Sequence, residues 1–135
     1  MATLRLEIVT PEAKAFSDDV DMVVLPGVEG ELGILPQHVP LMTQLKPGEL
    51  RVTKNGQETF LAVGEGFVEI TGERVSVMTD MAVEEKAIDE AAVQAAMERA
   101  EKRMREEHLG DEEVAAVQAA IQKSLAQLHL KRRRH

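Results

Sequence analysis

One stretch decides the fold of the first half of the chain: residues 49–63, which read ELRVTKNGQETFLAV. Two runs of strand-forming residues flank the dipeptide Asn55-Gly56. This dipeptide favours a type I′ turn, because both central positions of that turn need a positive φ that Asn and Gly adopt readily. The stretch therefore predicts a β-hairpin around residues 54–56.

Further strand signals lie on both sides of this hairpin. Apolar and polar residues alternate over residues 4–8, and an apolar run over residues 20–25 ends at Pro26-Gly27. Residues 66–78 contain two more strand-like runs around a turn at 71–73, which predicts a second hairpin. Many short strands separated by turn residues are typical of a sandwich or a barrel.

The composition changes near residues 81–87, which marks a boundary between a part at 1–83 and a part at 84–135. The second part contains no Pro, and apolar residues recur there at helical spacing in two blocks. We expect a first helix over about residues 87–107, with Gly110 at its C′ position and Asp111 as the N-cap of a second helix. The short break predicts an antiparallel helical hairpin, whose Ala-rich stripes make it marginal unless it is docked.

Charge and composition exclude several classes of function. The net charge is -8, from 16 Lys and Arg against 24 Asp and Glu, which argues against nucleic-acid binding. The absence of Cys excludes a disulfide framework and a thiolate metal site. Since the sequence shows neither a signal peptide nor a spanning apolar run, we expect the protein to be made and kept on the cytoplasmic side. No metal-ligand spacing, phosphate-binding loop or nucleophile motif is present, so we expect no metal, no cofactor and no catalytic residue.

Residues 30–41, GELGILPQHVPL, stand out from the rest of the first half. Two Gly and two Pro within twelve residues predict a fixed, irregular path rather than a regular strand. Glu31 and His38 are the ionisable residues of this segment, and Pro36 and Pro40 are expected to stiffen the loop around His38. Two interpretations remain open from the residues alone, a surface loop that recognises a partner and a well-packed turn between strands.

The segment GELGILPQHVPL resembles the most characteristic stretch of the epsilon subunit of bacterial F-type ATP synthases. Residues 9–11 (VTP), 24–27 (VLPG) and 64–70 (GEGFVEI) match the same family, and so does the order of a β part followed by a helical hairpin. The resemblance implies an α+β protein, with an N-terminal β-sandwich followed by a C-terminal antiparallel α-helical hairpin.

The resemblance also implies a function without bond chemistry, in the central stalk of the synthase. The sandwich would pack on the gamma subunit and on the membrane-embedded ring of c subunits, with Glu31 and His38 as contacts to the ring. The protein would couple proton-driven rotation of the c-ring and gamma to ATP synthesis, as a peripheral protein on the cytoplasmic face of the bacterial inner membrane. The alternative is a free-standing ATP-sensing or scaffolding module.

The hairpin would carry regulation. In bacterial relatives it folds against the sandwich or extends towards the alpha and beta subunits, where it blocks ATP hydrolysis. The positive charge of this chain gathers at residues 131–134, so the end of the second helix is either a cationic probe on an acidic body or a solvated, frayed tail. The candidate inhibitory contacts are Arg99, Lys123, Lys131, Arg132, Arg133 and Arg134.

Some relatives also bind ATP on the folded hairpin, through a motif on the first helix. Ile88 and Asp89 match this motif and Arg99 stands in a matching place, but Ala92 occupies the position of the motif arginine. Two further arginine positions, on the second helix, hold Lys123 and Gln127. The loss of guanidinium groups weakens phosphate binding, so the sequence disfavours an ATP site.

Overall fold

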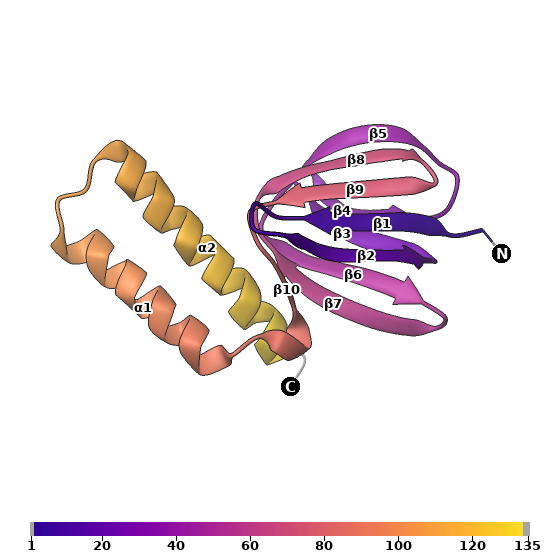
Figure 1. Ribbon diagram of the computed structural model, residues 1–135. Coiled ribbons are helices and arrows are strands. Elements are labelled where there is room, and N and C mark those ends of the chain that lie inside the picture. Colours follow the sequence, from indigo (N-terminus) through magenta and orange to yellow (C-terminus); the bar gives the residue numbers. More distant parts are fainter. Residues whose placement is uncertain (1, 134–135) are drawn as a thin grey trace.

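The computed structural model describes residues 2–133 and consists of a β-sandwich with two helices beside it (Figure 1). The strands are β1 (Leu4–Val9), β2 (Lys14–Val20), β3 (Met22–Gly27), β4 (Gly30–Ile34), β5 (His38–Leu45), β6 (Gly48–Lys54), β7 (Gln57–Val63), β8 (Gly66–Gly72), β9 (Arg74–Thr79) and β10 (Ala82–Glu84). The helical elements are the 3-10 helix η1 (Glu85–Ala87) and the α-helices α1 (Glu90–Glu106) and α2 (Asp111–Arg133).

The strands form two layers. The hydrogen-bonded order is β10-β7-β6-β3-β5-β8-β9-β1-β2, with β4 paired to β3. The path changes layer between β3 and β5, which pair at Gly27 opposite Leu45. One layer is therefore β10-β7-β6-β3-β4 and the other is β5-β8-β9-β1-β2, which confirms the β-sandwich.

The main core lies between these layers and is made of alternate strand residues. On β1 Leu4, Leu6 and Ile8 are fully buried, while Arg5 and Glu7 face outward. A strand with one buried face places every second side chain inside. Strands of both layers contribute such side chains to the core. The largest buried side chains of this core are Leu4, Leu6, Ile8, Leu25, Ile34, Leu50, Leu61 and Ile70.

Both predicted β-hairpins are confirmed. Asn55 has φ 52° and Gly56 has φ 77°, the two positive values that a type I′ turn needs, and Lys54 pairs with Gln57 across the turn. In the second hairpin β8 and β9 pair from Gly66 opposite Thr79 to Thr71 opposite Arg74, so the strands extend into the predicted turn.

The prediction of an irregular path over residues 30–41 is wrong. Residues 30–34 form β4, paired to β3, and residues from His38 onward form β5, paired to β8. Pairing satisfies the backbone donors and acceptors of the segment. The irregular features remain local: Gln37 has φ 68° in the connection, and Pro40 lies where the register shifts between His38 and Leu41. A proline is tolerated there because a bulge leaves one residue without a ladder bond.

The helices differ from prediction at their ends. The first begins at Glu90, because Asp89 is its N-cap and accepts a hydrogen bond from the Ala92 amide at 3.1 Å. The second begins at Asp111, one residue before its predicted start, and the Gly110 carbonyl accepts from the Val114 amide. Gly110 is therefore the N-cap position of α2 and not the C′ position of α1. The Glu113 carboxylate accepts from the Gly110 amide at 3.4 Å, one half of a capping box.

The helices form the predicted antiparallel hairpin, and α2 is the helix that contacts the sandwich (Figure 1). It packs on β6, β7 and η1 and buries Val117, Ser124, Leu128 and Leu130. A second, small core joins the two parts, with Phe60, Ala62, Ile88 and Leu130 as its buried members. Neither described helix is long and apolar enough to cross a membrane.

Candidate functional site

The outer face of the layer β5-β8-β9-β1 carries exposed apolar side chains in a row. Val9 on β1 is opposite Met78 on β9, and Met78 is opposite Phe67 on β8. Met42 on β5 is diagonal to Phe67, since Met42 pairs with Glu69 and Gln44 pairs with Phe67. The exposed fractions are 39% for Val9, 47% for Met78, 49% for Phe67 and 64% for Met42. We call these four residues the apolar row.

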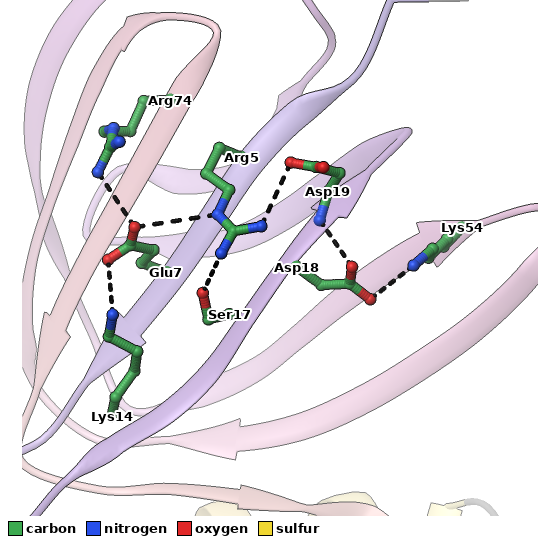
Figure 2. Close-up of polar contacts among 8 residues, drawn as sticks. All are labelled: Arg5, Glu7, Lys14, Ser17, Asp18, Asp19, Lys54 and Arg74. Atoms are coloured by element: carbon green, nitrogen blue, oxygen red, sulfur yellow. Dashed lines mark hydrogen bonds and ion pairs between the residues drawn. The ribbon is translucent and has the colours of Figure 1, made fainter.

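Figure 2 shows a network of charged side chains on β1, β2 and β9, the strands next to part of the apolar row. The Glu7 carboxylate lies 3.1 Å from the Arg74 Nη1, 3.5 Å from the Lys14 Nζ and 4.0 Å from the Arg5 Nε. Arg5 also donates to the Ser17 hydroxyl at 2.7 Å. Glu7 and Val9 face outward two residues apart on the same strand, so the apolar row and this charged rim form one continuous face.

A second group of charges ties the two layers together. The Lys54 ammonium on β6 donates to the Asp18 carboxylate on β2 at 2.7 Å, and the Asp19 amide donates to the same carboxylate at 2.8 Å (Figure 2). These hydrogen bonds, that from Lys54 above all, hold the pKa of the Asp18 carboxyl below its usual range. Strand β2, which carries Lys14 and Ser17 of the charged rim, is therefore tied to both layers.

Glu31 lies on the exposed side of β4, near the turn that joins β3 to β4. It pairs with Pro26, and the neighbouring pair is Gly27 with Gly30. Gly27 also pairs with Leu45 across its other edge, so β3 lies between Glu31 and the last residue of β5. Val28 in the same turn is 48% exposed.

His38 lies at the opposite end of β5, where it pairs with Gly72. Its Nδ1 is 2.7 Å from the Val39 carbonyl oxygen. Its sequence neighbours Leu35 and Val39 are 58% and 71% exposed. Strand β5 has eight residues, so His38 lies about 23 Å from Leu45, the end of β5 that pairs with β3, at the usual rise. The structure therefore does not bring Glu31 and His38 together.

The predicted basic contacts are mostly paired in this fold. Lys123 Nζ lies 3.9 Å from the Asp80 carboxylate, and Arg99 is exposed on α1. The residues 131–133 belong to the last turn of α2 and form ion pairs with acidic residues of three other elements. The frayed tail is therefore wrong for these three residues, and Arg134 lies outside the described residues.

The residues that match the nucleotide motif have structural roles here. Ile88 is 5% exposed and belongs to the small core between sandwich and hairpin. Asp89 caps α1. Gln127, at one of the arginine positions, donates its Nε2 to the Met81 Sδ at 3.2 Å. Packing, helix capping and this hydrogen bond explain the presence of these residues without a bound nucleotide.

We therefore expect no heat of binding when the full chain is titrated with MgATP in a calorimeter. The guanidinium groups that would contact phosphate are replaced at Ala92, Lys123 and Gln127, and Lys123 is held by Asp80. A dissociation constant in the micromolar range would contradict this expectation. MgADP and magnesium chloride are the matched controls for heats of dilution.

The described residues contain no group of three or more His, Asp or Glu placed to hold a metal ion. The sequence arguments missed the apolar row. The available signal was polarity: on a strand with one buried face, Phe67 and Met78 occupy positions that are usually polar. That signal is weak, since single exposed apolar residues are common and only the register shows that these four are neighbours.

Two family models cover almost the whole chain. The model for the ATP synthase delta/epsilon chain beta-sandwich domain matches residues 3–85, and the model for the long alpha-helix domain of the same chain matches residues 86–131. The chain belongs to the ATP synthase delta/epsilon family. The order of the two domains agrees with the sandwich and hairpin described above.

Curated relatives in this family are named ATP synthase epsilon chain. That of Desulforamulus reducens is 52% identical over 80 residues, which span 59% of this chain and 61% of the relative. That of Dehalococcoides mccartyi is 51% identical over 82 residues, which span 61% of this chain and 59% of the relative. The matched stretch thus covers about three fifths of the relatives' own length.

Two solved structures share the fold. A chain of the Euglena gracilis mitochondrial ATP synthase has a TM-score of 0.76 at 22% identity and covers all of this chain and 83% of its own length. A chain of the Tetrahymena thermophila mitochondrial ATP synthase, from its central stalk and c-ring, has a TM-score of 0.57 at 14% identity and covers 97% of this chain and 95% of its own length. At these identities the comparison supports the fold.

Proposed function

We propose that this chain is a non-catalytic subunit of the central stalk of an F-type ATP synthase, equivalent to the epsilon chain. In this function it binds the gamma subunit and the c-ring and couples proton-driven rotation of both to ATP synthesis. Membership of the family and the name of the curated relatives support this proposal.

The apolar row is the observation that carries the proposal. A face with exposed apolar residues at its centre and a charged rim beside it has the composition of a protein–protein interface. Neighbouring exposed apolar side chains on adjacent strands are unfavourable to leave in contact with water, and such groups are typical of a docking face. We assign this face to the gamma subunit, because the subunits of a central stalk that rotates as one body need a stable contact with each other.

Glu31 and His38 are proposed contacts to the c-ring. Glu31 is on β4, near the turn that joins β3 to β4, and His38 is the first residue of β5, so they would meet two separate points of the ring. Exposed apolar side chains accompany both, Val28 near Glu31 and Val39 beside His38. The protein would then be peripheral and attached to the cytoplasmic face of the bacterial inner membrane through the complex.

Co-purification tests the proposal against its alternative. Tagged full-length chain, expressed together with a gamma subunit of the same synthase, is expected to retain gamma through size-exclusion chromatography. A chain that elutes alone under these conditions contradicts the central-stalk function. In that case the alternative, a free-standing scaffolding or ATP-sensing module, is favoured.

The helical hairpin is proposed to act as a brake on ATP hydrolysis. Ending the chain after Leu109 removes α2, the helix through which the hairpin contacts the sandwich, and leaves the sandwich core intact. We therefore expect the assembled enzyme to hydrolyse ATP faster with the truncated chain than with the full chain. Equal rates across a range of ATP concentrations and driving force would refute the brake, while leaving the central-stalk function in place.

A further inference from the structure

The hairpin is attached to a sandwich that is already complete. All buried members of the main core among the described residues come from strands. None of the residues of α1, all of which the structure describes, is buried. The hairpin is therefore held through one side of α2 and through the small core around Leu130. Such an attachment can open without exposing the main core.

Three consecutive basic residues at the end of α2 reach three different elements. The Lys131 Nζ lies 3.9 Å from the Glu85 carboxylate and donates to the Glu85 carbonyl at 3.3 Å, which ties α2 to η1. Arg132 donates its Nε to Glu90 at 3.2 Å and its Nη2 to Gln94 at 2.8 Å, which ties α2 to α1. Arg133 pairs with Glu49, which ties α2 to β6 of the sandwich.

The position of these three basic residues at the C-terminal end of α2 adds to their stabilising effect. Cations in the last turn of a helix interact favourably with the helix dipole. The Lys131–Glu85 pair is shielded, with side chains that are 20% and 21% exposed, whereas Arg132 and Arg133 are about half exposed. Leu130, directly before these residues, is fully buried. One helical turn thus combines an apolar anchor with three ionic contacts.

We propose that Lys131 and Arg133 of this turn form an ionic clasp that holds the hairpin on the sandwich, and that raised ionic strength releases the hairpin while the sandwich stays folded. Exposed ion pairs are screened by salt, so the Arg133–Glu49 contact, whose basic side chain is more exposed than Lys131, weakens first. The inference concerns the chain by itself and does not depend on the proposed synthase partners.

Thiol labelling measures the release, because the natural chain has no Cys. Ser124 on α2 is 8% exposed and lines one pocket with Met81 and Val83, so the thiol of Ser124→Cys reacts when the hairpin opens. Val77 is fully buried in the main core, so the thiol of Val77→Cys reacts when the sandwich opens. From low salt to about 1 M potassium chloride we expect Ser124→Cys to react about tenfold faster and Val77→Cys to keep its rate.

A charge swap identifies the clasp itself. In the Ser124→Cys background at low salt, Arg133→Glu and Glu49→Arg should each raise the labelling rate about fivefold, and the two together should restore it. The matched control is Arg103→Glu, which removes a basic residue in the last turn of α1 that pairs with Glu107 and Glu113 at the far end of the hairpin. The labelling rate of the Ser124→Cys thiol should not change when Arg103→Glu is added.

Three results would overturn the proposal. The first is a Ser124→Cys rate that does not depend on salt. The second is a pair of single charge reversals that leave this rate unchanged, or a double reversal that fails to restore it. The third is an equal rise of the Ser124→Cys and Val77→Cys rates, which would mean that salt unfolds the whole chain.

Discussion

Gly66→Ala is expected to lower the free energy of unfolding by about 3 kcal/mol, among the largest losses that a single added methyl group causes. A Cβ at Gly66 would lie 1.9 Å from the Met78 carbonyl oxygen and 2.8 Å from the Thr79 Cα. These are backbone atoms of β9, the strand that pairs with β8 at this point. They cannot rotate away, so the two strands must separate.

Urea unfolding followed by far-UV circular dichroism measures this loss. Gly33→Ala is the matched control, because Gly33 also lies in a strand, and nothing lies within 4 Å of the Cβ that the substitution adds. We expect the control to stay within about 0.5 kcal/mol of the natural chain. A similarly small change for Gly66→Ala would show that the close approach of β8 and β9 is not required for stability.

The hairpins of the sandwich could be predicted because their signals are local. Asn55-Gly56 selects a turn that only a few residue types adopt, and the alternation around it fixes which side chains are buried. Residues 30–41 were mispredicted for the opposite reason. Gly and Pro weaken the local strand signal there, whereas β3, joined to β4 by a two-residue turn, and the distant strand β8 supply the hydrogen-bond partners.

The candidate site was harder to predict than the fold. Phe67 and Met78 face each other in one hairpin, but Val9 and Met42 are far from them in sequence, and only the order of the strands makes the four neighbours. The contacts of the basic end of α2 could not be predicted for the same reason. Its charge was visible in the sequence, but Glu49 and Glu85 become its partners only when α2 packs on the sandwich. Contacts that depend on topology cannot be derived from local spacing.

Phe67→Glu is expected to weaken binding to the gamma subunit at least about 100-fold, if the apolar row is the docking face. Phe67 lies within the row, between Met78 on β9 and the diagonal neighbour Met42 on β5. A carboxylate at this position would lose its water in the complex without an apolar partner or a counter-ion to compensate. The free chain should stay folded, because the Phe67 side chain faces outward and is about half exposed.

The affinity of full-length variants for immobilised gamma measures this effect, and circular dichroism checks the fold of each variant. Leu125→Glu is the matched control: Leu125 is 44% exposed, close to the 49% of Phe67, but it lies on α2, outside the apolar row. Loss of binding by Phe67→Glu alone would assign the docking face to the row. If both variants bind like the natural chain, the row is not the contact with gamma. Equal losses would mean that the added charge acts through the whole surface.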